Sequence, residues 1–385
     1  MKRNDCYTLK NLAGVPYLLP YGQTQADYKR SMRLNETGTF LWELLKEEHS
    51  KEELLAKCAE HYGIAETDMP QLKTDVEEFL GIMTAHSILV NDWNLPRVAG
   101  SEHRYFSIAG LNLCIYGASE AFPGEFEAFA IEKPADIHQT VALCPGIPAF
   151  RQNGRLIIRN KELVVIDAKD RYILEFPCMP KLLEVHLSKD GRKALLYYLP
   201  PLSELHRESF FHVLRLTYLY LALWKERIVL HSASLLYQGK AWLFSAPSGT
   251  GKSTHTGLWH DIFKTPYING DLNLITPQKD GPVIHGTPWC GTSGIYDTKT
   301  YPLGGIILLK QSSKNRIEEL SPDRKLLLVQ QRLITPSWTE ELLETNLKII
   351  EQILPHILVC RLYCTKEPDA VRTIKERIDH HLLDE

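Results

Sequence analysis

The chain has 385 residues, a formal net charge of −3, and 44% hydrophobic and 24% charged side chains. This length predicts two or three domains, and the small net charge argues against general attraction to nucleic acid or to an anionic membrane. No apolar run follows Met1–Asp5, and His212 and Arg215 interrupt the longest apolar stretch. We therefore expect a cytoplasmic protein without a membrane-spanning segment. The eight cysteines form no Cys-x-x-Cys pair, which argues against a structural zinc site.

Short helices and a strand are predicted in the first 92 residues. Apolar residues at helical spacing predict the first helix over residues 34–45. Ser50 and Glu53 form a capping box that starts the second helix. A third helix begins near Asp68, and a short strand at 88–90 follows it. Small helices with flanking strands predict a winged-helix-like module.

This segment resembles the PqqD-like family, the precursor-recognition domains of systems that modify ribosomal peptides. The resemblance covers residues 1–92, and its recognisable parts are Leu34-Asn35-Glu36-Thr37 and the helix at 75–80. It implies that a leader peptide adds as a strand to a sheet edge and packs on a helix. A precursor peptide is therefore an expected partner, and other peptide-modifying enzymes are further candidates.

Two other interpretations of the N-terminal segment are a DNA-binding winged helix and a purely structural helical cap. The third helix carries Lys73 amid Asp75, Glu77 and Glu78. Nucleic-acid phosphates repel such an acidic helix, so DNA binding is disfavoured. The structural cap stays open.

Residues 93–202 are predicted to be rich in short strands. Residues 92–101 have the composition of a linker, and strand-like runs such as 105–108, 111–115 and 172–176 follow, separated by turn signals. We expect this segment to pack on the domain that follows it and to help shape an acceptor groove.

Residues 245–254, Ser-Ala-Pro-Ser-Gly-Thr-Gly-Lys-Ser-Thr, have the pattern of a P-loop. An apolar strand precedes them and a predicted helix, Ser253 to about Phe263, follows, which is the context that such a loop requires. Backbone N–H groups and the positive end of the helix surround phosphates there, while the lysine and the hydroxyl reach terminal phosphates and Mg²⁺. Ala246 departs from the pattern, which usually has glycine there. The predicted nucleotide-binding residues are Ala246, Pro247, Ser248, Gly249, Thr250, Gly251, Lys252, Ser253 and Thr254.

The predicted catalytic residues are Lys252, His231 and Asp271. Residues 228–237 predict a strand that carries His231 and turns at 238–240 into the strand before the P-loop, as an antiparallel hairpin. Asp271 lies 18 residues after Ser253, so one helix and a returning strand bring its carboxylate to the phosphates. An acid there holds Mg²⁺ together with Ser253, or accepts a proton from an attacking hydroxyl.

A histidine strand, a P-loop and an aspartate strand in this order resemble the kinase domain of the HPr kinase/phosphorylase superfamily, the relatives of phosphoenolpyruvate carboxykinase. The resemblance covers about residues 203–385 and implies a P-loop kinase core of that type, with ATP and Mg²⁺ as cofactors. The family often has two consecutive acids where this chain has Gly270-Asp271. This departure favours simple kinase chemistry over the bifunctional kinase/phosphorylase activity.

A second glycine-rich segment, residues 286–294, lies between two predicted strands. Loops that carry function lie between rigid elements in this way, so one expectation is an acceptor-side or phosphate-side loop that faces the P-loop. The other is a plain tight turn, and the sequence leaves both open. The tail after residue 322 alternates helix, strand and helix, which suits an α/β core.

Together these patterns predict a mixed α/β (α+β) multidomain protein with domains at 1–92, 93–202 and 203–385. A recognition module joined to a P-loop kinase predicts an ATP-dependent kinase that phosphorylates a Ser or Thr hydroxyl of a precursor peptide. Three other hypotheses stay open: an NTP-hydrolysing peptide maturation factor, a small-molecule kinase, and a non-catalytic nucleotide-sensing protein.

Overall fold

The computed structural model describes every residue except 5, 23–24, 26–30, 48, 87, 91–101, 118–121, 147, 149–153, 169, 180, 248 and 385. The chain forms two compact units, Met1–Pro96 with Ile147–Arg155, and Arg97–Gly146 with Leu156–Glu385. The predicted mixed α/β class is confirmed, because helices and several separate sheets are both present. The predicted linker at 92–101 lies outside the described residues, and the predicted boundary at residue 202 falls inside the second unit.

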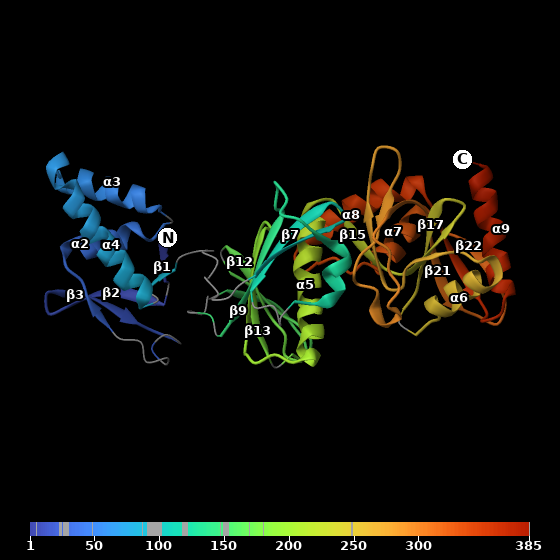
Figure 1. Cartoon of the computed structure of the whole chain (residues 1–385), viewed down its shortest axis with the longest axis horizontal. Helices are drawn as coiled ribbons and strands as arrows, with labels where there is room; N and C mark the ends of the chain where they lie inside the picture. Colours follow the sequence, from blue (N-terminus) through green and yellow to red (C-terminus); the bar gives the residue numbers. More distant parts are fainter. Residues whose placement is uncertain are drawn as a thin grey trace. The chain divides into compact units, whose positions relative to one another are not determined.

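The first unit combines helices with a small antiparallel sheet (Figure 1). Its helices are α2 (Glu36–Leu44), α3 (Lys51–Tyr62) and α4 (Met69–Ala85). Its strands are β1 (Lys2–Arg3), β2 (Tyr7–Leu12), β3 (Val15–Pro20), β4 (Met32–Arg33) and β5 (Leu89–Val90). The sheet order is β2-β3-β4, and β1 pairs separately with β5. The helices and the closing strand therefore form where the sequence predicts them.

Local sequence signals explain these elements. The predicted capping box is present, since the Ser50 hydroxyl accepts from the Glu53 N–H and the Glu53 carboxylate accepts from the Ser50 N–H. Gly63 ends α3 in the left-handed conformation, with φ of 62°. Ala13 and Gly14 also have positive φ, as the two central residues of a tight hairpin turn require, and they join β2 to β3. That hairpin was not among the predicted strands.

The second unit contains a nine-stranded sheet formed by the middle of the chain (Figure 1). Its order is β10-β11-β12-β13-β14-β9-β7-β6-β8. The bounds are β6 (Glu102–Ile108), β7 (Leu111–Gly117), β8 (Ala130–Ile131), β9 (Gln139–Pro145), β10 (Arg155–Arg159), β11 (Val164–Asp167), β12 (Arg171–Glu175), β13 (Leu182–Ser188) and β14 (Lys193–Tyr198). A short 3-10 helix, η3 (Gly124–Phe129), precedes β8. The predicted abundance of strands in this segment is thus confirmed.

The C-terminal half forms another sheet, in which β15, β19, β20, β21, β17, β16 and β18 are neighbours in that order and β23 joins β21 to β22. The strands are β15 (Ile228–His231), β16 (Ala233–Tyr237), β17 (Lys240–Ser245), β18 (Tyr267–Asn269), β19 (Leu272–Thr276), β20 (Val283–His285), β21 (Thr300–Gln311), β22 (Arg316–Glu319) and β23 (Leu358–Cys364). The helices are α6 (Lys252–Phe263), α7 (Pro322–Gln330), α8 (Glu340–Ile353) and α9 (Asp369–Leu383). β17, β21 and β23 are parallel, so their carboxyl ends meet at one edge of the sheet.

The prediction of one continuous strand over residues 228–237 is wrong. The chain breaks at Ser232, so that β15 pairs with β19 while β16 pairs with β17 and β18. A matching break at Gly270-Asp271 separates β18 from β19. The predicted antiparallel hairpin into β17 is nevertheless present, with Gln238 and Gly239 both at positive φ.

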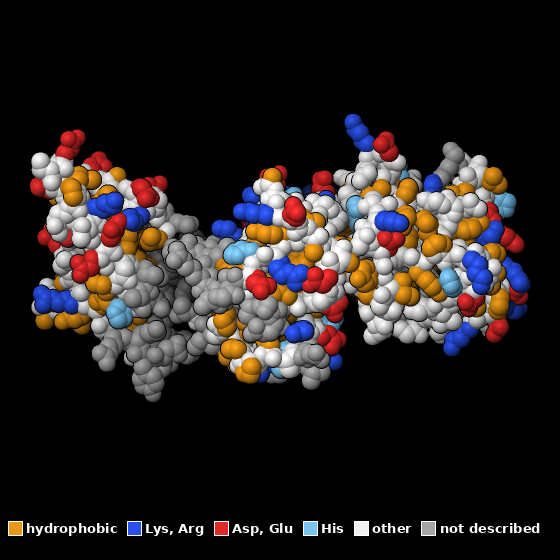
Figure 2. Space-filling model, in the orientation of Figure 1, with side chains coloured by type: hydrophobic (Ala, Val, Ile, Leu, Met, Phe, Trp, Pro, Cys, Tyr) orange, Lys and Arg blue, Asp and Glu red, His pale blue; other side chains and the backbone are white. Residues whose placement is uncertain are grey.

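Helix α5 (Glu204–Trp224) joins the two sheets of the second unit, because it packs against β13 on one side and β15 on the other (Figure 1). One hydrophobic core contains buried side chains from both sheets and from α5, such as Val185, Tyr218 and Leu274. Over the described residues no helix has the length and apolarity to cross a membrane. Acidic and basic side chains are interspersed over the described part of the face in Figure 2.

Candidate active site

The glycine-rich loop, residues 246–251, joins the end of β17 to the start of α6. Gly249 and Gly251 have φ of 74° and 105°, which other residues rarely adopt, and a Cβ at either position would meet nothing within 4 Å. The glycines are therefore needed for backbone conformation. The first N–H groups of α6 lack partners within the helix, and together with the helix dipole they favour an anion at this end.

The predicted nucleotide-binding residues divide into groups. Gly249, Gly251, Lys252, Ser253 and Thr254 line one cavity of about 360 Å³. Pro247 and Thr250 line a second cavity of about 350 Å³ on another side of the loop, together with Leu328, Arg332 and Arg361. Ser248 lies outside the described residues.

Ala246 lines neither cavity, because its side chain is fully buried in a core that includes Phe244 and Trp259. The departure from glycine at this position thus serves packing beneath the loop.

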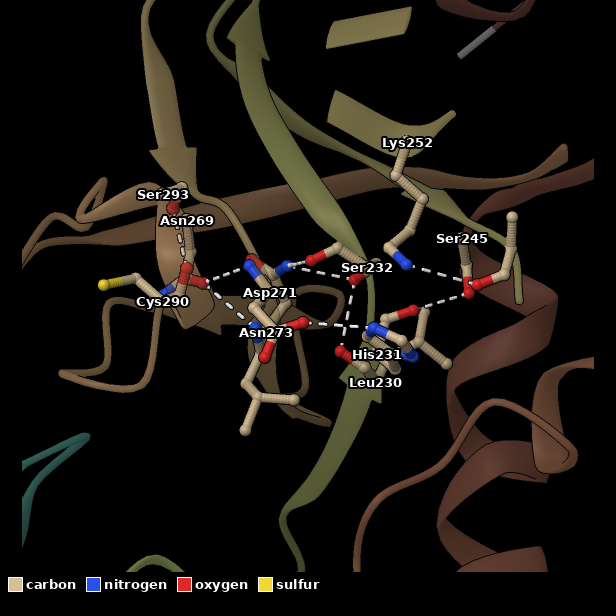
Figure 3. Close-up of polar contacts among 12 residues, drawn as sticks. Leu230, His231, Ser232, Ser245, Lys252, Asn269, Asp271, Asn273, Cys290 and Ser293 are labelled. Carbon is tan, nitrogen blue, oxygen red and sulfur yellow. Dashed lines mark hydrogen bonds and ion pairs between the residues drawn. The ribbon is translucent and has the colours of Figure 1, made fainter. Parts of the chain in front are cut away.

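His231 and Asp271 form the polar centre of the first cavity. The His231 Nε2 atom lies 3.0 Å from the Asp271 Oδ1 atom, and Figure 3 shows the two side chains pointing toward one another. Burial pushes the pKa of Asp271 up, but the hydrogen bond and charge of His231, with the charges of Arg215 and Lys252, outweigh it. The pKa of Asp271 therefore lies below its ordinary value, and the carboxylate is ionised at neutral pH.

Lys252 contributes an ammonium group to the same cavity. Its Nζ atom donates to the Ala246 carbonyl at 3.3 Å, and no carboxylate of the described chain forms an ion pair with it. Burial lowers its pKa, the negative charge of Asp271 opposes this, and the positive charge of Arg332 adds to it. A cation held in this way gains from the arrival of an anion such as a phosphate.

A buried network of amides and hydroxyls holds Asp271 in place. The Asn269 side chain accepts hydrogen bonds from the N–H groups of Asp271 and Leu272, at 2.8 and 3.0 Å. The Ser232 N–H donates to the Asp271 carbonyl, and the Asn273 side chain donates to the Ser232 carbonyl (Figure 3). This network joins the two strand breaks, which explains how His231 and Asp271 come to face each other.

The predicted glycine-rich segment 286–294 is part of a longer loop, residues 286–299, that joins β20 to β21. In this 286–299 loop, Cys290, Gly291, Thr292 and Ser293 line the same cavity as Asp271 and Lys252. Gly291 has φ of 62°, and a Cβ there would lie 3.0 Å from the Asp271 Cβ atom. Of the two expectations for this segment, the geometry agrees with a loop that faces the glycine-rich loop.

The close approach of this loop also explains the missing second acid. A Cβ at Gly270 would lie 2.1 Å from the Ser293 hydroxyl oxygen and 3.1 Å from the Cys290 carbonyl oxygen. No side chain fits at position 270 unless the 286–299 loop moves. Asp271 therefore supplies the carboxylate among the residues that line this cavity.

Sequence reasoning missed several residues around the site. Arg215 on α5 and Arg332 after α7 act electrostatically on Asp271 and Lys252, respectively. The His231 N–H donates to the Arg332 carbonyl at 2.9 Å, which fixes the segment after α7 beside β15. Asn269 and Asn273 were also missed, although amides within otherwise apolar strands are a signal that could have found them.

The donor set fits Mg²⁺, which prefers oxygen ligands and keeps several waters. The Ser253 hydroxyl and the Asp271 carboxylate line the same cavity. Among the described residues no cluster of three or more His, Cys, Asp or Glu side chains could hold a metal. A magnesium ion here would thus rely on Ser253, Asp271 and the phosphate oxygens that it accompanies.

Residues 25–89 match the family described as Coenzyme PQQ synthesis protein D (PqqD), so this part of the chain is a PqqD-like domain. No curated protein matches the chain. A solved structure titled "TbiB1 in Complex with the TbiA(beta) Leader Peptide" aligns at 21% identity over 24% of this chain and 96% of that chain. Its TM-score is 0.20, so it carries no argument about the fold.

Proposed function

We propose that this chain is an ATP-dependent kinase that phosphorylates a Ser or Thr hydroxyl of a ribosomally made precursor peptide, whose leader is bound by the PqqD-like domain. One observation carries the catalytic half of the proposal. A lysine and a hydroxyl at a helix N-terminus share one cavity with a carboxylate that is hydrogen-bonded to a histidine. Phosphoryl transfer requires backbone groups that hold the phosphates, a cation and an ionised acid, and this cavity has all three.

In the proposed reaction the γ-phosphoryl group of ATP lies against Lys252 and the first N–H groups of α6. Mg²⁺ held by Ser253 and Asp271 would neutralise charge on the β- and γ-phosphates. Asp271 accepts a hydrogen bond from the acceptor hydroxyl and orients its oxygen toward the γ-phosphorus. Its lowered pKa makes it a weak base, so orientation contributes more than early proton removal. His231 keeps the carboxylate in position through the 3.0 Å contact.

The PqqD-like domain favours a peptide over a small molecule as the acceptor. The outer edge of β2 has no strand partner within the described chain, since β2 pairs with β3. A leader peptide that adds as a strand at such an edge gains main-chain hydrogen bonds. Tethering the leader raises the effective concentration of the distal hydroxyl at the active site.

The test is transfer of phosphate to a peptide. The full chain is incubated with Mg·ATP and with peptides expressed from short reading frames beside its gene, and peptide mass is measured. A phosphorylated peptide is expected, and Lys252→Ala should abolish it because the cavity loses its ammonium group. Lys279→Ala, at an exposed turn, is the matched control that should retain activity.

Other outcomes identify the rival hypotheses. ADP release without a phosphopeptide supports a maturation factor that hydrolyses ATP. Binding of ATP without turnover supports a nucleotide sensor. Phosphorylation of full-length precursor that is no faster than that of leaderless core contradicts leader recognition and favours the small-molecule kinase. A proline in the pairing segment of the leader should weaken its binding, since proline removes a ladder donor.

A further inference from the structure

Thr292 places a hydroxyl-bearing side chain of this chain in the candidate active site. It lies in a 3-10 turn, η4 (Gly291–Ser293), and lines the same cavity as Lys252, Ser253 and Asp271. The residue is exposed. The preceding residue, Gly291, lies beside the Asp271 side chain, since a Cβ added to Gly291 would lie 3.3 Å from Asp271 Oδ2. Thr292 therefore directly follows a residue that lies beside the proposed catalytic carboxylate.

The two neighbouring hydroxyls of η4 differ in their hydrogen bonds. The Ser293 hydroxyl donates to the Cys290 carbonyl at 2.6 Å and accepts from the Ile295 N–H at 3.1 Å. Within the described chain the Thr292 hydroxyl has no such partner. Ser293 thus holds the turn together, while Thr292 presents a hydroxyl that no structural bond occupies.

The turn that carries Thr292 is fixed relative to the site. The Gly270 N–H donates to the Ile295 carbonyl at 3.1 Å, and the Gly286 N–H donates to the Lys299 carbonyl at 2.9 Å. A hydroxyl held beside a reacting group by its own chain has a much higher effective concentration than a free acceptor. An intramolecular acceptor at this position needs no binding step.

We infer that Thr292 is an intramolecular phosphoryl acceptor, so that the protein phosphorylates itself on the 286–299 loop when no peptide occupies the cavity. The inference rests on the proposed kinase function and names a modification site for it. The Thr292 Oγ1 atom bonds to the γ-phosphorus of ATP, and the bond from that phosphorus to the β–γ bridging oxygen breaks. The bridging oxygen takes the electron pair and leaves with ADP, and the hydroxyl proton passes to the Asp271 carboxylate.

The modification opposes further turnover. A phosphothreonine carries a charge of about −1.5 to −2 at neutral pH. In this cavity the charge would lie beside Asp271 and in front of Lys252, where it repels the phosphates of the next ATP and pairs with the ammonium group. A bound acceptor peptide excludes Thr292 from the γ-phosphate, so peptide protects the enzyme from this modification.

The test uses the full chain with Mg·[γ-³²P]ATP and no peptide. Intact mass should rise by a single phosphoryl group, and fragmentation should place it on Thr292. The first-order rate constant for phosphate incorporation should be independent of protein concentration, as expected for transfer within one molecule. Thr292→Val should lose the label, Thr292→Ser should retain it, and Asp271→Asn should slow it.

Thr298→Val is the matched control, because Thr298 is an exposed hydroxyl residue of the same loop that does not line the cavity. ATP binding by Thr292→Val, measured by calorimetry, shows that the variant is folded. Label on another residue, or no label from a protein that phosphorylates its peptide, overturns the inference and leaves the proposed function standing. Absence of both label and phosphopeptide overturns the proposed function as well.

Discussion

The two glycine-containing loops around the cavity use glycine for different physical reasons. In the glycine-rich loop, Gly249 and Gly251 have positive φ, and added Cβ atoms would meet open space. In the 286–299 loop, a Cβ at Gly286 would lie 1.6 Å from the Asp297 carbonyl oxygen, although its φ is not positive. Gly249 and Gly251 are thus needed for backbone conformation, whereas Gly286 is needed for room. The first reason leaves a recognisable motif, whereas the second depends on which segment packs there.

The largest effect is expected at Asp271, which lines the cavity together with residues of both loops. Asp271→Asn should lower turnover by roughly 10²-fold or more, the scale expected when an acid that orients the acceptor or its metal is lost. Asparagine keeps the size of the side chain, so circular dichroism should show an intact fold. Steady-state kinetics with Asp280→Asn, an exposed turn residue, is the control. Turnover near that of the unaltered chain would assign the role to another residue.

Gly286→Ala should be the most damaging glycine change in the 286–299 loop. The added methyl group meets backbone rather than a mobile side chain, and overpacking of this kind costs about 1–3 kcal/mol, occasionally more. Because the loop contacts Asp271 through Gly291, turnover should fall together with stability. Thermal unfolding and kinetics measure both. An unchanged melting temperature would show that the loop is free to move away.

Gly249→Ala should have a smaller effect, of a different kind. No atom obstructs the methyl group, so the cost is the left-handed conformation alone, roughly 1–2 kcal/mol. The loop is exposed at this position, and the strain should appear mainly as weaker ATP binding. Calorimetric titration compares ATP binding by this variant with that by Gly281→Ala, which also replaces a glycine at positive φ in open space but at a position that does not line the cavity. Equal ATP affinities in the two variants would contradict the conformational role of Gly249.

The smallest effect concerns pH. Burial raises the pKa of Asp271, but the hydrogen bond and charge of His231 and the charges of Arg215 and Lys252 outweigh it, so folding lowers this pKa from its ordinary value of 3.8. Its contribution to the free energy of unfolding is complete above the unfolded pKa and is lost as pH falls through the folded pKa. Below pH 3.8 the unaltered chain should therefore lose free energy of unfolding relative to Asp271→Asn, because only the unaltered chain has this carboxylate to protonate. Denaturant titrations at several pH values test this, and a difference that does not change with pH would contradict it.

Local signals predicted much of the first unit and of the loop before α6. The Ser50–Glu53 capping box sets the start of α3, and Gly63 sets its end. The hairpin into β17 follows from a two-residue turn that contains Gly239, which tolerates its positive φ. These features depend on residues a few positions apart, so the sequence alone suffices. The β2–β3 hairpin escaped prediction because its turn, Ala13-Gly14, carries a weaker signal.

The sequence by itself determined the chemistry that is available: a lysine and a hydroxyl at a helix start, a histidine before a hairpin and an aspartate after the next strand. Only the tertiary structure decided how these groups meet. At the strand breaks, the buried Asn273 amide donates to the Ser232 carbonyl, 41 positions away in the sequence, and the Asn269 amide oxygen accepts from the Asp271 N–H. The exclusion of a second acid likewise depends on the 286–299 loop packing against Gly270. Both are consequences of close packing between distant segments, which no local pattern encodes.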